Sequence, residues 1–241
     1  MKVLVFIPAR YGSTRLEAKP LKLIKNKPMV EWVYEGVSKA KTPDSVFVAT
    51  DDERIKKAVE AFGGKVVMTS PDCKTGTERV AEAAAKMDAD IVVNAQGDEP
   101  LIDGSVIDAC VAPFKTDKSL LLSTPVVKLT DPHEIQNPNV VKAIADKDGF
   151  AIYFSRSPIP YVFPGAPLPL YYKHIGVYAY KRDFLFKMSS MAQTPLEISE
   201  RLEQLRVLEN GYKIKLVETS YNPISVDTQE DLDKVRSMVG G

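Results

Sequence analysis

The sequence predicts an α/β fold in which a mainly parallel central sheet is flanked by helices and followed by an elaborated antiparallel second half. In the first half, short β-branched runs alternate with segments of helical apolar spacing, as in parallel strands joined by crossover helices. In the second half, longer and partly alternating runs are typical of antiparallel strands. A chain of 241 residues is long enough for one large domain with a well-buried core.

The elements of the first half follow from apolar runs and from the residues that bound them. Pro28 suits the first turn of a helix, and Gly63-Gly64 ends another. The predicted strands are 2–8, 45–50, 65–70 and 90–96, and the predicted helices are 28–40, 51–64 and 77–87. Parallel strands with right-handed crossovers bind ligands beyond their carboxyl ends. The segments PARYGSTR, Asp51-Asp52 and QGDEP therefore share one rim.

The second half has a different pattern. The sequence DKDG at 146–149 lies between two strand-like runs and indicates a hairpin. Residues 157–171 hold five prolines and predict a surface loop. The predicted strands are 120–129, 140–145, 150–156, 174–180 and 213–220, and the predicted helices are 198–211 and 228–239. Gly211 ends the first of these helices, and Asp227 or Thr228 caps the second.

Composition restricts the classes of function. Lys+Arg and Asp+Glu both number 32, so the net charge is zero and nothing indicates general attraction to nucleic acid or to an anionic membrane. Any anion site must be local. No apolar run is long enough to span a bilayer. Cys73 and Cys110 lack zinc-site spacing and are expected to be reduced thiols, so we predict a cytoplasmic protein.

The stretch PARYGSTRLEAKPL, residues 8–21, is a candidate phosphate site. Its Gly-Ser-Thr turn allows close backbone approach, and Arg10, Arg15 and Lys19 could neutralise a polyphosphate. It matches neither the dinucleotide fingerprint GxGxxG nor the P-loop GxxxxGK[ST]. On this stretch alone, a solvated basic turn explains the sequence equally well.

Two aspartates are candidate magnesium ligands. Asp98 follows a buried strand in NAQGDEP, and Asp227 lies at a strand-to-helix junction in SVDTQEDL. Magnesium takes one or two carboxylates and completes its shell with water and substrate phosphates. Asp98 could instead be a turn residue, and on spacing alone a helix cap is the better interpretation of Asp227.

Three further positions have ordinary structural interpretations. Thr75 and Glu78 have the spacing of a capping box at a helix start. His174 is a lone histidine in an apolar strand, where a structural role is the more common one. Glu203 and Gln204 lie in an amphipathic helix, where a solvated face is expected.

Taken together, these segments resemble the CMP-Kdo synthetases, the 3-deoxy-D-manno-octulosonate cytidylyltransferases, from about residue 2 to residue 236. The basic opening motif is shared with other sugar cytidylyltransferases, whereas QGDEP, YFSR, KHIG and LEQLR are more specific to the Kdo branch. The motifs are PARYGSTRLEAKPL, ATDDE, TGTERV, NAQGDEPLI, YFSRSPIP, KHIGVYAY, LEQLRVLENG and VDTQEDL.

The resemblance implies a site residue by residue. It implies that nucleotide-binding residues are Ala9, Arg10, Gly12, Ser13, Arg15, Lys19, Thr75, Gly76 and Gln96. It implies that Mg²⁺ is held by Asp98 and Asp227, and that Arg10, Lys19, Asp98 and Asp227 are catalytic. It implies that the sugar acid is bound by Arg79, Arg156, His174, Tyr178, Glu203 and Gln204.

The resemblance also implies the reaction and the architecture. We expect a single-domain, Rossmann-like nucleotidyltransferase fold over 1–241, with a nucleotide-binding part at about 1–115 and sugar-binding and dimerisation elements at about 116–212. The enzyme would transfer CMP from CTP to the anomeric hydroxyl of Kdo for lipopolysaccharide synthesis, as a magnesium-dependent homodimer. Two departures are visible: Glu17-Ala18 stand where the family often has Pro-Gly, and Gln229 replaces a first-turn proline.

Other functions remain open at this point. The opening motif does not separate Kdo from 8-amino-Kdo or from a sialic acid as the sugar that is activated. A non-catalytic nucleotide-binding domain could use the same fold, although the presence of both Asp98 and Asp227 argues against mere binding. A glycosyltransferase is the weaker alternative, because the Asp146-Lys147-Asp148 sequence that follows a predicted strand is already interpreted as part of a hairpin turn.

Overall fold

The computed structural model describes residues 1–12 and 16–239, so Ser13 and Arg15 lie outside the described residues. The chain divides into two compact units. The first unit comprises Met1–Asp108 with Asn222–Gly241, and the second comprises Ala109–Tyr221. That these units act as the single domain expected from the sequence stays a prediction.

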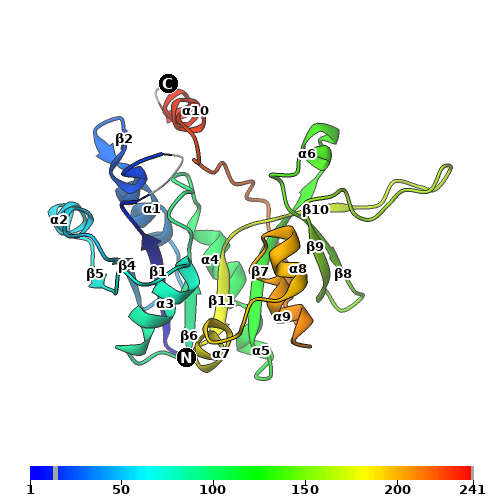
Figure 1. Cartoon of the computed structure of the whole chain (residues 1–241), viewed down its shortest axis with the longest axis horizontal. Helices are drawn as coiled ribbons and strands as arrows, with labels where there is room; N and C mark the ends of the chain where they lie inside the picture. The colour runs from blue at the N-terminus through cyan, green and yellow to red at the C-terminus, as the bar shows by residue number, and fades with distance from the viewer. Residues whose placement is uncertain (13–15, 240–241) are drawn as a thin grey trace. The chain divides into compact units, whose positions relative to one another are not determined.

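The first unit is built on a parallel sheet with strand order β5–β4–β1–β6 (Figure 1). Its strands are β1 (Val3–Ala9), β4 (Ser45–Thr50), β5 (Val66–Met68) and β6 (Ile91–Asn94). β1 is bonded in parallel to β4 on one side and β6 on the other, and nearly all its residues are buried. This confirms the parallel first half. Burial on both sides explains why β1 reads as a continuous apolar run.

The helices of the first unit begin where their sequences predict. Asp52 caps α2, its carboxylate accepting from Arg54 N at 2.8 Å, and Thr75 caps α3, its hydroxyl accepting from Glu78 N at 3.1 Å. The helices are α1 (Met29–Ser38), α2 (Glu53–Ala61), α3 (Gly76–Ala85) and α10 (Gln229–Val239), with α4 (Gly104–Val111) crossing the boundary between the units. α4 is not among the helices that the sequence predicts.

The C-terminal segment returns to the start of the chain. Leu232 and Val235 of α10, with Val226 before it, form one buried apolar cluster with Leu16 and Met29. The elements between these last two are the 3₁₀ turn η1 (Lys19–Leu21) and the short strands β2 (Leu23–Ile24) and β3 (Lys27–Pro28). This packing brings the segment before α10 to the loops that follow β1.

The second unit is organised around β7 (Leu122–Leu129). β7 pairs antiparallel with β10 (Tyr171–His174) and β11 (Tyr178–Lys181), and parallel with β12 (Lys215–Glu218). β10 also pairs with β8 (Lys142–Ala145), which pairs with β9 (Ala151–Ser155). The predicted hairpin is confirmed, and Gly149 takes a φ of 75° in its turn. The predicted strand 174–180 is interrupted between β10 and β11.

The helices of the second unit are short, and the one predicted over 198–211 is wrong. In place of one helix, the structure has two, α8 (Pro195–Glu200) and α9 (Leu205–Glu209). The chain leaves α8 at Arg201, which has a left-handed φ of 55°. A buried ion pair between Glu197 and Arg206 joins the two helices. Three others were not predicted: α5 (Pro113–Thr116), α6 (Pro132–Gln136) and α7 (Arg182–Ser189).

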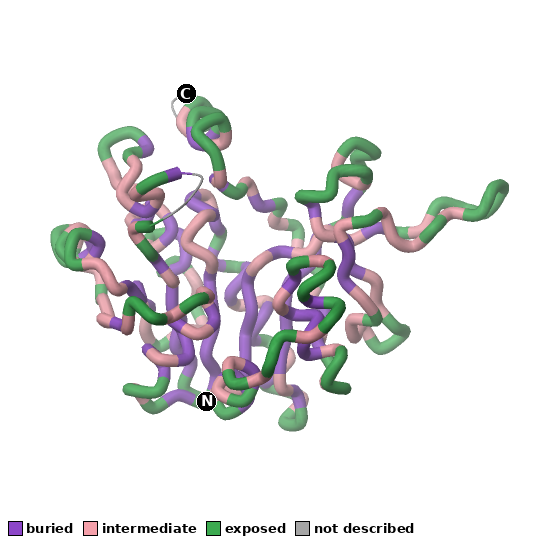
Figure 2. The backbone as a smooth tube through the Cα atoms, viewed as in Figure 1, coloured by how far each residue is buried: buried purple, intermediate pink, exposed green. Residues whose placement is uncertain are grey.

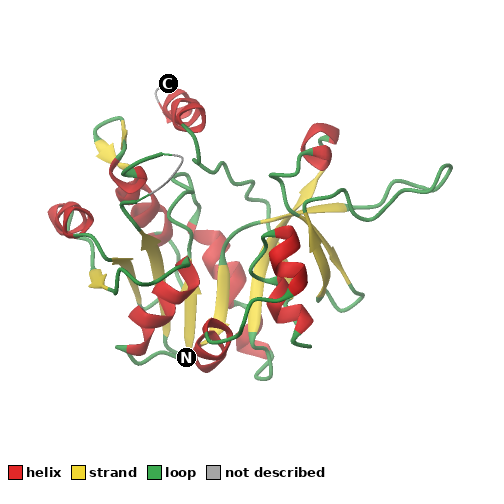
Figure 3. Ribbon diagram, in the orientation of Figure 1, coloured by secondary structure: helices red, strands yellow, loops and turns green. Residues whose placement is uncertain are grey.

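The proline-rich segment 157–170 is a long loop of the second unit. Figure 3 shows it without helix or strand, and Figure 2 shows it mostly exposed. This confirms the predicted surface loop. Among the described helices, none is both long enough and apolar enough to cross a membrane.

Ala18, which departs from the family pattern, has a backbone conformation whose effect on stability can be measured. Ala18 has a φ of 54° just before η1, where a Cβ costs about 1–2 kcal/mol. We expect Ala18→Gly to raise the free energy of unfolding by about 0.5–1 kcal/mol, because relief of strain exceeds the added entropy of the unfolded chain. Urea unfolding measures this change.

Ala112 supplies the matched control. It is exposed and has helical angles, φ −52° and ψ −44°. Ala112→Gly should therefore lower the free energy of unfolding by about 0.5–1 kcal/mol. If both variants lose stability equally, backbone strain at Ala18 is not the cause.

Candidate active site

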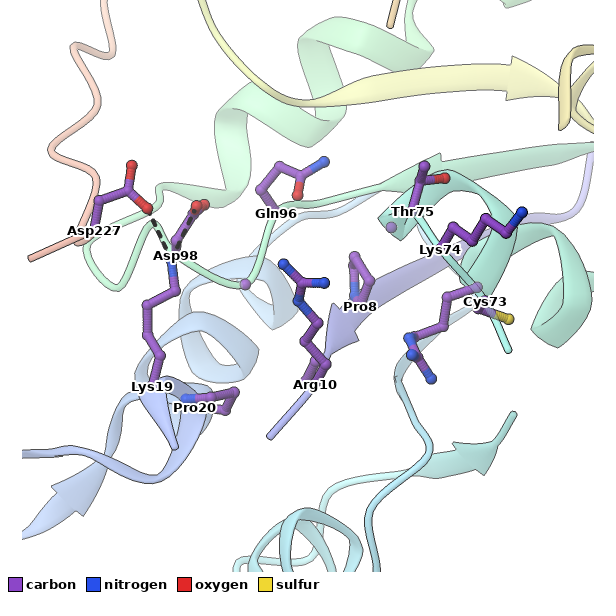
Figure 4. Close-up of a pocket in the computed structure, with 14 residues that line it drawn as sticks. Pro8, Arg10, Lys19, Pro20, Cys73, Lys74, Thr75, Gln96, Asp98 and Asp227 are labelled. Atoms are coloured by element: carbon purple, nitrogen blue, oxygen red, sulfur yellow. Dashed lines mark hydrogen bonds and ion pairs between the residues drawn. The ribbon is translucent and has the colours of Figure 1, made fainter. Parts of the chain in front are cut away.

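The first unit holds a cavity of about 280 Å³ at the carboxyl ends of β1 and β6. It brings together predicted site residues from five separate stretches of sequence (Figure 4). The predicted residues that line it are Ala9, Arg10, Lys19, Thr75, Gly76, Arg79, Gln96, Asp98 and Asp227. Prediction from sequence missed Pro8, Pro20, Cys73, Lys74 and Gly97. Gly12 is described but is not part of this lining.

Two exposed cations border the cavity, Arg10 after β1 and Lys74 before α3. Within the described part of the chain, no carboxylate pairs with either side chain. Figure 4 shows the Arg10 guanidinium between the Asp98 and Thr75 sides of the cavity. The cavity therefore carries positive charge that its own acidic residues do not neutralise, which suits an anionic ligand.

The start of α3 faces the same cavity. Thr75 caps the helix, and Glu78 Oε2 accepts a hydrogen bond from Lys74 N at 2.7 Å. Thr75 and Gly76 both line the cavity. The Thr75 cap is confirmed, whereas Glu78 accepts from Lys74 and not from the Thr75 N–H as a capping box would require. The cap places a helix N-terminus, with its partial positive charge, at the site.

Glycine at 97 permits a close approach of two backbones. A Cβ there would lie 2.8 Å from Pro8 O, closer than real contacts allow. At Gly76 a Cβ would lie 3.3 Å from Pro8 Cγ. The loop after β6 and the start of α3 therefore both pack against the end of β1. Because neither glycine has a side chain, the backbone segments that carry Gln96 and Thr75 can both lie close to Pro8 at the cavity wall.

Asp98, Asp227 and Lys19 form one ionic cluster. The Lys19 ammonium lies 3.3 Å from Asp98 Oδ2 and 3.1 Å from Asp227 Oδ1. It also donates to Val226 O at 2.9 Å. The Asp227 backbone is held as well, since its N–H donates to Asp231 at 3.0 Å. The two carboxylates thus converge on a single cation.

The helix-cap interpretation of Asp227 is not what the structure shows. Thr228 performs that role, because its hydroxyl accepts from Asp231 N at 3.2 Å. The Asp227 carboxylate points to Lys19 instead. Among the described residues, no group of three or more histidine, cysteine, aspartate or glutamate side chains could hold a metal. A metal at this cluster would have two protein carboxylates.

Arg79 is buried within the first unit. Its guanidinium contacts Asp51 Oδ2 at 2.9 Å and Thr69 Oγ1 at 2.7 Å. These contacts fix the guanidinium at the cavity wall, beside the end of β4. The five other predicted sugar-binding residues belong to the second unit. A sugar contact of Arg79 stays a prediction.

The cysteines offer no nucleophile. Cys73 Sγ donates to Glu82 at 3.2 Å, and partial burial together with this carboxylate raises the pKa of the thiol to about 11. Complete burial raises the pKa of Cys110 too. Both are free cysteines and stay protonated near neutral pH, so covalent catalysis by a thiolate is disfavoured.

Arg156 follows β9 in the second unit and is held on several sides. Its Nε donates to Glu200 O at 2.7 Å and its Nη1 to Pro138 O at 2.9 Å. Its carbonyl accepts from the buried ammonium of Lys142. Among the described residues, Nη2 has no hydrogen-bond partner. The guanidinium is thus oriented by backbone carbonyls and retains one nitrogen for a ligand.

His174 and Tyr178 lie in an aromatic cluster of the second unit. The His174 ring is 5.0 Å from Phe154 and 5.4 Å from Tyr178 between centroids. Complete burial lowers the pKa of His174 to about 3, so it is neutral near pH 7. Its Nε2 lies 2.9 Å from Thr124 Oγ1. Burial and the nearby charge of Glu203 raise the pKa of Tyr178.

The position of Gln204 in an amphipathic helix predicted a solvated face, and the structure shows that this prediction is wrong. Gln204 is 3% exposed, because the chain turns at Arg201 between α8 and α9. Its Nε2 is buried and has no hydrogen-bond partner among the described residues. Such a donor costs free energy unless a ligand or water accepts from it. It is therefore a better candidate for ligand binding than its sequence position indicated.

Comparison with known proteins agrees with this geometry. Residues 4–214 match the family model described as cytidylyltransferase. The 3-deoxy-manno-octulosonate cytidylyltransferase of Geotalea daltonii is 52% identical, covering 98% of this chain and 97% of the relative. That of Fusobacterium nucleatum is 53% identical, covering 98% and 96%.

Solved structures show the same relationship. A CMP:2-keto-3-deoxy-manno-octonic acid synthetase complexed with CTP superposes with a TM-score of 0.95 at 41% identity, covering 100% of this chain and 99% of that one. A 4-diphosphocytidyl-2C-methyl-D-erythritol synthase from Anaerococcus prevotii, with a TM-score of 0.64 at 15% identity, shows the fold alone. The resemblance found in the motifs is thus confirmed over nearly the whole chain, which belongs to the cytidylyltransferase family and, within it, to the 3-deoxy-manno-octulosonate cytidylyltransferases.

Proposed function

We propose that this chain transfers CMP from CTP to the anomeric hydroxyl of Kdo, releasing pyrophosphate and supplying CMP-Kdo for lipopolysaccharide synthesis. The observation that carries the proposal is the convergence of cations, a helix N-terminus and two carboxylates on one cavity. This combination suits a metal-bound triphosphate. The relatives named above, with about half of their residues identical, bear the name of this activity.

The nucleotide would lie in the cavity of the first unit. Arg10 and Lys74 border it with positive charge that no carboxylate of the described residues pairs, and Thr75 and Gly76 bring the start of α3 to it. These groups would hold the phosphates, with Gln96 near the base. Ser13 and Arg15, which lie outside the described residues, are expected to complete the phosphate loop.

The carboxylate pair fits a magnesium ion. Asp98 and Asp227 already share one cation, the Lys19 ammonium, so their oxygens can converge on a metal. Magnesium prefers oxygen ligands and completes its shell with water and substrate phosphates, as a two-carboxylate site requires. When bound, the ion would make the attacking hydroxyl easier to deprotonate and would offset charge at the α-phosphate.

The residues of the chain would act mainly through positioning and charge. The anomeric hydroxyl attacks the α-phosphorus in line, the bond to the bridging oxygen breaks, and pyrophosphate leaves. Arg10 and Lys19 would stabilise the negative charge that grows on this leaving group. Both cysteine thiols stay protonated, which agrees with direct transfer that needs no covalent enzyme intermediate.

The sugar acid would be recognised by residues of the second unit. Arg156 would bind the carboxylate of the sugar acid through its Nη2. The backbone carbonyls of Glu200 and Pro138 hold its guanidinium in place for this contact. The buried amide of Gln204 would donate to a sugar hydroxyl. His174, neutral because of its burial, would offer hydrogen bonding and no charge. Tyr178 and Glu203 would complete the set.

Release of pyrophosphate tests the function directly. The purified protein is incubated with CTP and Mg²⁺ together with Kdo, 8-amino-Kdo or N-acetylneuraminate. Release with Kdo that EDTA abolishes supports the proposal. Release with 8-amino-Kdo or N-acetylneuraminate alone would keep the cytidylyltransferase and change its substrate. Absence of release with all three by folded protein would contradict it.

Asp98→Asn should lower turnover by at least about a hundredfold, because it removes a principal charge from the proposed metal site. Asp103→Asn is the control from the same loop, since an asparagine oxygen can still accept the bond that Ser105 N makes to Asp103 at 2.8 Å. Steady-state kinetics at saturating CTP and Kdo measure both variants. Near-normal turnover of Asp98→Asn would show that the metal assignment is wrong.

Arg156→Ala should raise the KM for the sugar acid by roughly tenfold to a hundredfold, the usual effect of losing a hydrogen bond to a charged group. The KM for CTP should change little. Arg201→Gly is the control, since it removes a neighbouring cation at a residue whose φ of 55° suits glycine. A rise confined to the KM for CTP would contradict the carboxylate role.

A homodimer is proposed through the second unit. In the proline-rich loop, Tyr161 is 82%, Phe163 73% and Leu168 84% exposed. Large apolar side chains presented together in one segment are typical of a protein interface. Light scattering should give a dimer mass, reduced toward the monomer by Phe163→Ser with Leu168→Ser. Leu23→Ser, at an exposed position of the first unit, should leave it unchanged. A monomeric mass for the unaltered protein across working concentrations would contradict the dimer.

A further inference from the structure

The Lys19 ammonium occupies the place at which the two proposed metal ligands meet (Figure 4). It makes three contacts, to Asp98 Oδ2 at 3.3 Å, Asp227 Oδ1 at 3.1 Å and Val226 O at 2.9 Å. An ammonium has three donors, so these contacts use its full capacity. Its side chain is only 16% exposed. In this arrangement Lys19 has no donor left for a phosphate.

The same lysine is the expected partner of the triphosphate. It cannot satisfy both sets of partners from one position, because its donors are already used. A magnesium ion at this site would be held by the same two carboxylates that now contact the ammonium. An ammonium and a divalent cation held by the same two oxygens would repel each other strongly in a partly buried site. Lys19 and the metal are therefore alternative occupants.

We propose that Lys19 is a tethered placeholder cation, which occupies the carboxylate pair in the nucleotide-free protein and releases it when phosphates arrive. The inference rests on the proposed nucleotide and metal sites. The flexible four-carbon side chain allows the move. While the Lys19 ammonium contacts Asp98 and Asp227, it compensates their negative charge, so their affinity for a free metal ion is low. Nucleotide phosphates draw the ammonium away, so metal loading is coupled to nucleotide binding.

Metal binding to the nucleotide-free protein tests this role. Mn²⁺, whose free form is counted by electron paramagnetic resonance, serves as the probe for the magnesium site. Lys19→Met removes the charge and keeps the length of the side chain. It should bind Mn²⁺ at least about tenfold more tightly than the unaltered protein, because a competing cation is gone. Asp98→Asn added to Lys19→Met should abolish the gain.

Two controls separate displacement from general charge. Lys22→Met removes a cation from the same turn, at a residue with no described contact to either aspartate, and should leave Mn²⁺ affinity within about twofold. Lys19→Arg keeps the charge and should not tighten binding. Equal tightening in Lys22→Met and Lys19→Met would overturn the placeholder, because the effect would then be long-range electrostatics alone.

A second measurement does not depend on Lys19→Met being folded. In EDTA, Asp227→Asn should bind CTP several-fold more tightly than the unaltered protein, since Lys19 is then held less firmly and can reach the phosphates. Asp103→Asn removes an equal charge from an aspartate that does not contact Lys19, and it should have a smaller effect. Equal effects from the two variants would overturn the proposal.

The failure of this inference can be distinguished from failure of the proposed function. If the unaltered protein binds Mn²⁺ with a non-hydrolysable CTP analogue, yet Lys19→Met gains nothing without nucleotide, the placeholder is wrong and the metal site stands. If neither the unaltered protein nor Lys19→Met binds Mn²⁺, with or without the CTP analogue, both the placeholder role and the metal assignment are overturned. Tightening in Lys19→Met that requires Asp98 supports both.

Discussion

The arrangement of the loops around the cavity of the first unit depends on a cation between Asp98 and Asp227. Both carboxylates reach the Lys19 ammonium, which is itself mostly buried. Carboxylates that share a partly buried site repel each other unless a cation compensates them. The backbone supports the same arrangement, since Val226 N donates to Asp98 O at 2.8 Å. The early turn, the loop after β6 and the segment before α10 are thus held together by charge, and the apolar cluster around Leu232 holds them by packing.

The parallel sheet makes this convergence possible. Since β1, β4 and β6 run in the same direction, the loops that follow them lie at one edge. Gly97 then allows the loop after β6 to approach Pro8 more closely than any side chain would permit. The start of α3 joins the same edge with its capped N-terminus at Thr75. Charge from Arg10 and a helix end therefore act on one cavity without a dedicated glycine-rich phosphate motif.

The second unit depends on polar groups whose partners are backbone carbonyls. Lys142 is fully buried and donates to the carbonyls of Asn137, Val140 and Arg156. Burial lowers the pKa of this lysine, although the nearby charge of Glu200 partly opposes the shift. The network orients Arg156 from its backbone while Glu200 and Pro138 orient its guanidinium. Such buried networks are costly when incomplete and rigid when satisfied, which suits a site that must hold a guanidinium still.

The sequence by itself determined the order and type of most elements, the parallel first half, the hairpin at Gly149 and the cap at Thr75, because these follow from local apolar spacing and short-range hydrogen bonds. The motifs also named most of the residues of the cavity, but they missed Pro8, Pro20, Cys73, Lys74 and Gly97. Only the tertiary structure decided that Thr228 caps α10 while Asp227 meets Lys19, and that a turn at Arg201 buries Gln204. The contact between Asp227 and Lys19 joins residues 208 positions apart in the chain, and local spacing does not contain such a contact.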